Sequence, residues 1–73
     1  MKFKNIEMLI DGSGEITIGK VGQTPCATAP DDHQCLAMLA RRADETLEAL
    51  LRRLDSAIAD AIEEQIFVDE ING

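Results

Sequence analysis

The sequence predicts an α+β fold in which an N-terminal β-hairpin packs on one long C-terminal amphipathic helix. Between Pro30 and Gly73 the chain contains neither glycine nor proline, and apolar residues recur there at helical spacing over about seven turns. Before Pro30, apolar and polar residues alternate on either side of a glycine-rich turn. The 73 residues are therefore predicted to form a single domain, 1–73, made of a hairpin (1–22), a connection (23–30), the helix (31–66) and a tail (67–73).

The predicted hairpin has its turn at residues 11–14, which read Asp-Gly-Ser-Gly. Apolar residues occupy alternate positions before this turn and again after it. Because cross-strand neighbours share a face of a sheet, a three- or five-residue loop keeps these side chains together, whereas a two-residue loop would separate them. Residues 19–30 are rich in Gly, Pro, Thr, Gln and Ala, and they are predicted to form an irregular connection. The alternating apolar residues are Ile6, Met8, Ile10, Ile16 and Ile18.

The predicted helix begins between Thr28 and Asp32, where either Thr28 or Asp31 can cap its first turn. Its apolar stripe keeps its phase across Asp55–Ser56, the only plausible break, which favours one continuous helix over two shorter ones. Beyond Ala61 the phase is lost, so the tail either folds back over the hairpin or extends the helix with a second apolar contact. The stripe comprises Leu36, Leu39, Ala43, Leu47, Leu50, Leu54, Ile58 and Ala61.

The predicted helix is too long for the hairpin to cover. A helix of about 33 residues spans roughly 50 Å, whereas a strand of about five residues covers only about 17 Å. The uncovered leucines would form an apolar patch larger than monomers usually expose. The sequence therefore predicts a helix-mediated homodimer in which two copies bury the stripe.

The net charge of −7 is concentrated in the C-terminal half of the chain. Residues 1–30 contain three lysines and three acids, whereas the residues from Asp55 onward contain six acids and no base. Carboxylates in the last turns of a helix oppose its dipole, so they serve either solubility or the binding of a basic partner. Direct nucleic-acid binding is not expected without a basic patch. The predicted partner-binding acidic end comprises Asp60, Glu63, Glu64, Phe67, Asp69 and Glu70.

Chemically reactive side chains are few. Cys26, His33 and Cys35 are the only soft-metal ligands, and their spacing matches no common zinc site, so no metal or other cofactor is expected. A disulfide between the two cysteines is also disfavoured. Residues 11–22 lack the features of a calcium or phosphate loop. Since no nucleophile has an identifiable base, the protein is not expected to be an enzyme.

Two functions remain open. The first is a small acidic interaction module, such as an inhibitor that mimics nucleic acid and occupies the basic surface of a partner protein, as phage inhibitors and antitoxins do. The second is a structural helical dimer whose charge serves only solubility. A cytoplasmic location without membrane contact is predicted for either, because no apolar run is long enough to span a membrane and no signal peptide is recognisable.

Overall fold

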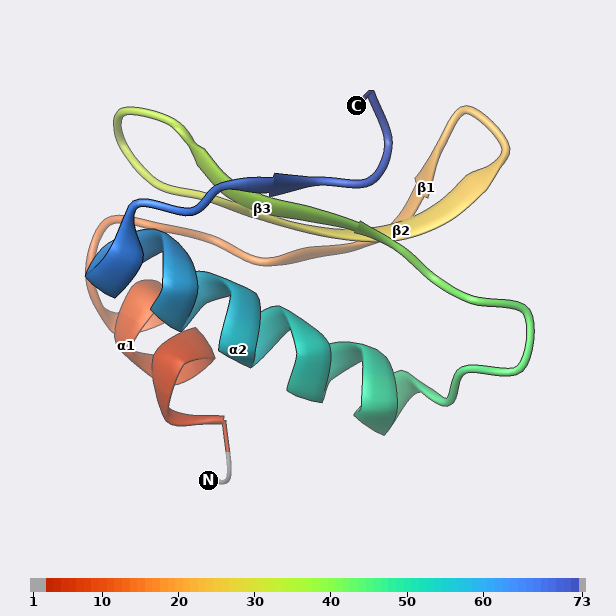
Figure 1. Cartoon of the computed structure of the whole chain (residues 1–73), viewed down its shortest axis with the longest axis horizontal. Coiled ribbons are helices and arrows are strands. Elements are labelled where there is room, and N and C mark those ends of the chain that lie inside the picture. The colour runs from red at the N-terminus through yellow and green to blue at the C-terminus, as the bar shows by residue number, and fades with distance from the viewer. Residues whose placement is uncertain (1–2, 73) are drawn as a thin grey trace.

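The computed structural model describes residues 3–72, with Val21 described by its backbone alone. The elements in chain order are α1 (Lys4–Asp11), β1 (Thr17–Val21), β2 (Thr24–Pro30), β3 (Cys35–Ala40), α2 (Leu47–Glu64) and β4 (Val68–Asp69). All four strands belong to one sheet, and both helices lie on the same side of it (Figure 1). The fold is thus α+β, but the predicted arrangement of one hairpin on one long helix is wrong.

The sheet is mixed, with the strand order β1-β2-β3-β4. The first three strands form an antiparallel meander, whereas β4 runs parallel to β3. A parallel neighbour requires a crossover connection, and α2 provides it by carrying the chain from the end of β3 back to the start of β4. The crossover places Val68 beside Ala37 and Asp69 beside Met38. As a result, the C-terminal segment lies at an edge of the sheet and next to α2.

Residues 4–11 form helix α1 instead of the first strand of the predicted hairpin. Ile6 and Leu9 are buried, whereas Met8 and Ile10 are about half exposed. The buried positions therefore follow helical i, i+3 spacing, although the same short segment also alternates like a strand. The turn predicted at 11–14 follows the helix, where the Gly12 N–H donates to the Met8 carbonyl.

The observed hairpin joins β1 and β2 through Gly22, whose φ of 64° favours glycine. Residues 23–30 were predicted to be an irregular connection, so this prediction is wrong for most of the segment. The prolines occur near the two ends of β2, where they disturb the ladder least. Pro30 lies at a bulge, because Pro30 pairs with Cys35 while the preceding residue pairs with Ala37. The bulge leaves Leu36 as an extra residue on β3, and both Leu36 and Ala37 are buried.

The predicted helix over 31–66 is also wrong in its first half. Residues 35–40 form β3, residues 41–46 connect it to α2, and the helix begins at Leu47. Thr46 caps this helix, because its Oγ1 accepts a hydrogen bond of 3.1 Å from the Ala49 N–H. From there α2 continues without a break through Asp55 and Ser56, as the phase of its apolar residues predicts.

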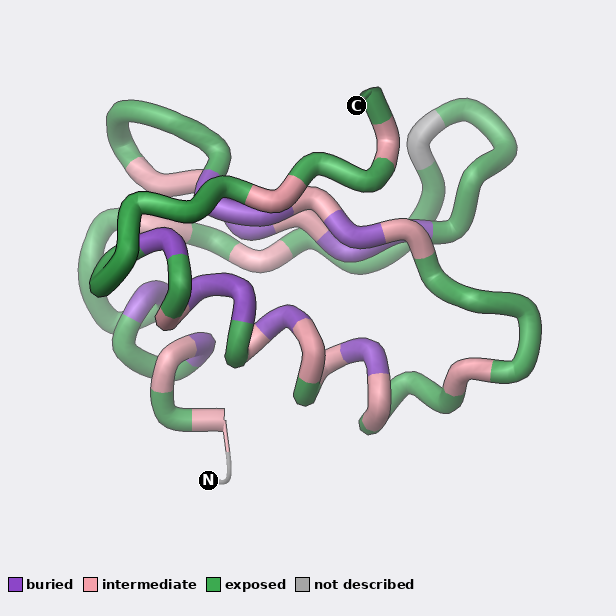
Figure 2. The backbone as a smooth tube through the Cα atoms, viewed as in Figure 1, coloured by how far each residue is buried: buried purple, intermediate pink, exposed green. Residues whose placement is uncertain are grey.

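The stripe predicted to form a dimer interface lies largely inside one chain (Figure 2). Four of its residues belong to α2 and are buried against the sheet: Leu50, Leu54, Ile58 and Ala61. Two more, Leu36 and Leu39, come from β3 and pack into the same core. Ala43 and Leu47 are exposed. Because six of its eight residues are buried within one chain, the stripe is not the dimer interface that the sequence predicted. Whether the protein forms a homodimer through another surface stays a prediction.

Helix α1 is attached to α2 by the carboxylate of Asp55. The Oδ1 atom accepts hydrogen bonds from the Asn5 N–H (2.8 Å) and the Ile6 N–H (2.9 Å), and Oδ2 accepts from Asn5 Nδ2 (3.0 Å). The side chain of the N-cap residue Phe3 makes no capping bond. Asp55 therefore replaces a local cap and places a negative charge at the positive end of the α1 dipole.

Candidate functional site

Residues 62–67, at the C-terminal end of α2, form a continuous exposed segment that contains large apolar side chains. Every residue in it is exposed, including Ile62 (45%), Ile66 (54%) and Phe67 (42%). These are three of the seven large apolar side chains that the structure shows as exposed between residues 3 and 72. Glu63 and Glu64 lie between them in the sequence. We call residues 62–67 the C-terminal patch.

A reversal of the chain at Gln65 gives this patch its shape. Gln65 adopts the left-handed conformation, with φ 59° and ψ 31°, and ends α2. The N–H groups of Gln65 and Ile66 both donate to the Asp60 carbonyl, the latter over 3.2 Å. This arrangement satisfies a carbonyl of the last helical turn. Glu63 and Glu64 thus remain on the helix, while Ile66 and Phe67 follow the reversal and lead toward β4 (Figure 1).

The six residues predicted to form the acidic end divide into two groups. Asp60, Glu63, Glu64 and Phe67 are exposed at the end of α2. Asp69 instead accepts hydrogen bonds from the N–H groups of Ile71 (3.0 Å) and Asn72 (2.8 Å) and so forms part of a turn.

Glu70, the sixth predicted residue, is bound to Arg53 in a three-residue ion-pair cluster. The guanidinium Nη1 of Arg53 donates to Glu70 over 3.1 Å. Its Nε and Nη2 donate to the two carboxylate oxygens of Glu45 over 2.7 and 2.9 Å, and Nη2 also donates to the Ala40 carbonyl over 3.0 Å. No base lies near Glu70 in the sequence, but the crossover brings β4 beside α2 and so brings Arg53 to it.

The cluster is partly shielded from solvent. The Glu45 side chain is only 5% exposed, compared with 22% for Arg53. Hydrogen bonds from the Arg53 side chain and then from the Arg42 N–H lower the pKa of Glu45 to about 2, and the Glu45 hydrogen bond raises the pKa of Arg53. Both groups stay charged at neutral pH. The cluster holds the 41–46 connection, β3, α2 and the C-terminal segment together.

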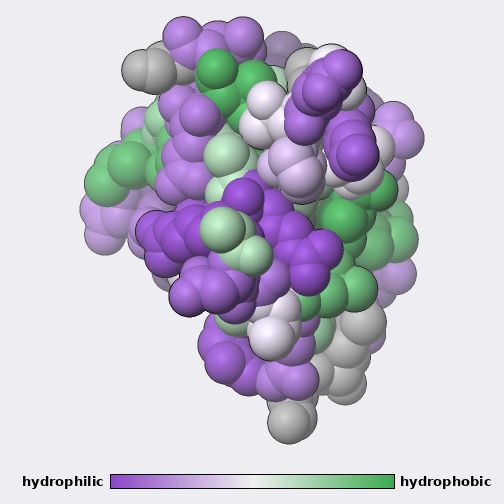
Figure 3. Space-filling view, turned by 90° about the vertical axis from the view of Figure 1, so that its right-hand side faces the viewer, coloured by the Kyte–Doolittle hydropathy of each residue, from purple (hydrophilic) through white to green (hydrophobic). Residues whose placement is uncertain are grey.

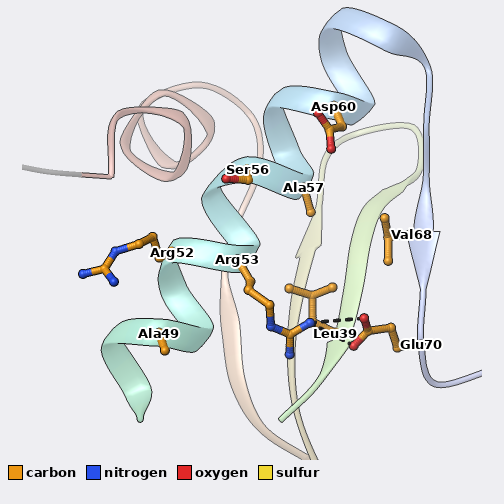
Figure 4. A pocket seen from close by; sticks show the side chains of 9 residues that line it. All are labelled: Leu39, Ala49, Arg52, Arg53, Ser56, Ala57, Asp60, Val68 and Glu70. Carbon is orange, nitrogen blue, oxygen red and sulfur yellow. Dashed lines mark hydrogen bonds and ion pairs between the residues drawn. The ribbon is translucent and has the colours of Figure 1, made fainter. Parts of the chain in front are cut away.

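A groove of about 370 Å³ lies between α2 and β4 (Figure 4). Leu39, Ala57 and Val68 provide its apolar part, while α2 contributes three exposed polar residues along one side, Arg52, Ser56 and Asp60. The remaining lining residues are Ala49, Arg53 and Glu70. Sequence reasoning missed the groove because its two walls are joined only through the parallel pairing of β4.

Acids lie near both ends of α2, with Asp44 and Glu48 at its start, whereas bases lie near its start but not in its last turn. Arg41 and Arg42 are exposed on the connection that precedes the helix, whereas Glu63 and Glu64 are exposed on its last turn. Figure 3 looks onto the end of the molecule that carries this connection, and hydrophilic residues cover most of the front of that face. The C-terminal patch, by contrast, combines acids with large apolar side chains. This combination distinguishes it from an ordinary solvated helix end.

The residues considered for metal or thiol chemistry do not come together. Cys26 is buried, Cys35 is exposed, and both are free thiols. His33 is exposed. The N–H groups of His33 and Gln34 donate to the Asp31 carboxylate and lower its pKa, so Asp31 stabilises a turn before β3 and not the predicted helix start. Within residues 3–72, no three His, Cys, Asp or Glu side chains are grouped so that they could hold a metal ion.

Comparisons with protein-family models, with curated proteins and with solved structures found no significant match. Neither helix in the described part of the chain is long and apolar enough to cross a membrane.

Proposed function

We propose that the protein is a non-enzymatic interaction module whose C-terminal patch binds a basic surface of a partner protein. The observation that carries this proposal is the uninterrupted exposure of residues 62–67, where Ile62, Ile66 and Phe67 accompany two carboxylates. In many protein interfaces an aromatic side chain becomes buried on binding while charged groups surround it at the rim. Asp60 extends the acidic surface by one helical turn, whereas Asp69 and Glu70 serve the fold.

The charge of the patch indicates the chemistry of the partner. Glu63 and Glu64 form no ion pair among the described residues, and acids at the C-terminal end of a helix are unfavourable for that helix. A basic partner surface would offset this cost and would be attracted over several ångströms. The partner class that fits is a nucleic-acid-binding protein whose basic surface the patch would occupy. Such a partner would be met in the cytoplasm, the compartment that the sequence predicts.

The proposal is tested by comparing two variants that lose the same charge. Glu63→Gln/Glu64→Gln removes two acids from the patch, and Asp11→Asn/Glu15→Gln removes two exposed acids elsewhere. Each tagged protein is used to capture partners from cells of the source organism at low and at high salt. A specific partner should be retained by the wild type and by the Asp11/Glu15 variant at low salt, and be lost from the Glu63/Glu64 variant. Its association rate should fall as salt screens the charges.

Phe67→Ala provides a second readout. The ring is 42% exposed, so its removal should leave the melting temperature almost unchanged while increasing the dissociation rate of the partner. If the Glu63/Glu64 and Phe67 variants capture the same protein as strongly as the wild type, the patch is not the binding surface. The acids then serve solubility only.

A further inference from the structure

The wall of the groove formed by α2 carries an ordered row of polar residues. Arg52, Ser56 and Asp60 are spaced four residues apart, so they form one ridge on the helix surface. All three are exposed and line the groove. The ridge has a positive charge at one end, a hydroxyl group at its centre and a negative charge at the other end. It is therefore complementary in charge to a second ridge of the same sequence that runs in the opposite direction.

We propose that this groove is a contact face for a second copy of the chain, docked antiparallel about a twofold axis near Ser56. In this arrangement Arg52 of each copy lies opposite Asp60 of the other. The contact is isologous, so the ion pair between Arg52 of one copy and Asp60 of the other forms twice from one surface. A parallel arrangement would instead place arginine against arginine and aspartate against aspartate. The charges thus select one orientation as well as one partner.

The surroundings of the groove leave room for the second copy. Among residues 3–72, β4 pairs with β3 alone and forms an edge of the sheet, and Val68 on it is half-buried. In the view of Figure 4, α1 lies on the opposite side of α2 from β4, so it does not cover the groove. Leu39 and Ala57 are already buried at the floor of the groove, so a second copy would cover mainly the half-buried Val68. This removes partly exposed apolar surface from water.

The ion pair that Arg52 already makes does not prevent this contact. Arg52 pairs with Glu48 one turn earlier on the same helix, and the side chains of these residues are 64% and 61% exposed. A pair this exposed contributes little to stability, so Arg52 can turn toward an acid on another copy at small cost. The contact face also differs from the Leu36–Ala61 stripe, which is buried in each chain, and from the C-terminal patch. Asp60 also belongs to the acidic surface of the proposed function, whereas Arg52 does not, so Arg52→Asp tests the dimer separately from partner binding.

Charge reversal tests the proposal with two variants and their mixture. Arg52→Asp places two acids against two acids in its own dimer, and Asp60→Arg places two arginines against two arginines. Each variant alone should lose the dimer seen by size-exclusion chromatography with light scattering over a concentration series. An equimolar mixture restores both ion pairs and should recover a species of twice the mass of the single chain.

A matched control separates this contact from net charge. Asp60→Arg changes the net charge from −7 to −5, since one negative charge becomes one positive charge. Glu63→Arg makes the same change outside the groove lining and should leave the dimer intact. Circular dichroism verifies that each variant is folded. The proposal is overturned by a monomeric wild type, by a reversal variant that dimerises like the wild type, by a mixture that stays monomeric, or by a control that loses the dimer.

Discussion

Gly14 occupies a position where the chain passes too close to its neighbours for any side chain. A Cβ atom at this position would lie 2.4 Å from both Cγ and Cδ1 of Leu9 and 2.9 Å from the carbonyl oxygen of Pro30. The Leu9 side chain is buried. The Pro30 oxygen is held by a 3.1 Å hydrogen bond from the Glu15 N–H. Gly14→Ala therefore cannot be accommodated unless Leu9 and the chain between α1 and β1 both shift.

The cost of this shift follows from the packing of the site. Adding a methyl group to a well-packed core costs about 1–3 kcal/mol, and the main-chain contact with Pro30 places Gly14→Ala toward the upper end. A chain of this length has a total stability of roughly 4–11 kcal/mol. Each kcal/mol corresponds to a melting temperature lower by about 4–8 °C in a domain of this size. The variant should therefore melt well below the wild type.

Urea unfolding followed by circular dichroism measures the effect, and Gly19→Ala is the matched control. A Cβ at Gly19 would have no heavy atom within 4 Å, so this substitution should be neutral or stabilise by about 0.4–1 kcal/mol through the unfolded state. In a Leu9→Ala background, Gly14→Ala should cost less than alone, because part of the clash has been removed. Equal midpoints for Gly14→Ala and Gly19→Ala would refute the reasoning.

Two further predictions concern the ion-pair cluster and the core. The pKa of the Glu45 carboxyl is about 2 in the folded protein, compared with an ordinary value of 4.5 for the unfolded chain. The charged carboxylate therefore stabilises the fold above pH 4.5, and this stabilisation is lost as the pH falls toward 2. Glu45→Gln should flatten the acid side of the stability curve in urea titrations, and an unchanged curve would show that the cluster contributes no linked stability. Leu54 is fully buried and Leu47 is 47% exposed, so Leu54→Glu should unfold the protein while Leu47→Glu should leave the circular dichroism spectrum intact. Similar melting temperatures for these two variants would contradict the placement of the stripe.

The sequence predicted the second half of the chain better than the first. In α2 the apolar residues keep one helical phase over 18 residues, which no strand reproduces. The segment 35–40 consists only of apolar residues, and a short apolar run fits a buried strand as well as a helix. The bulge at Leu36 buries two consecutive residues and removes the alternation that would have indicated β3. Residues 41–46, which are mostly polar, follow this segment and could have indicated that the helix begins only after them.

The structure shows where the residues of the predicted acidic end lie, while their role in binding a partner stays a prediction. Glu63, Glu64 and Phe67 lie in a segment whose helical phase fails, and they are exposed. The role of Glu70 could not be predicted in this way, because its partner Arg53 is 17 residues away in the sequence. Their contact requires the parallel pairing of β4 with β3, which no periodicity encodes. The groove depends on the same pairing and was missed for the same reason.

The capping of α1 by Asp55 has a consequence for the order in which the protein forms during synthesis. A helix of eight residues is only marginally stable by itself, and the acceptor for its first N–H groups is about 50 residues further along the chain. The residues of α1 are therefore synthesised well before the residue that caps them. Until α2 has folded, Ile6 and Leu9 have no core to enter, so α1 is made before α2 but is fixed in place only after it.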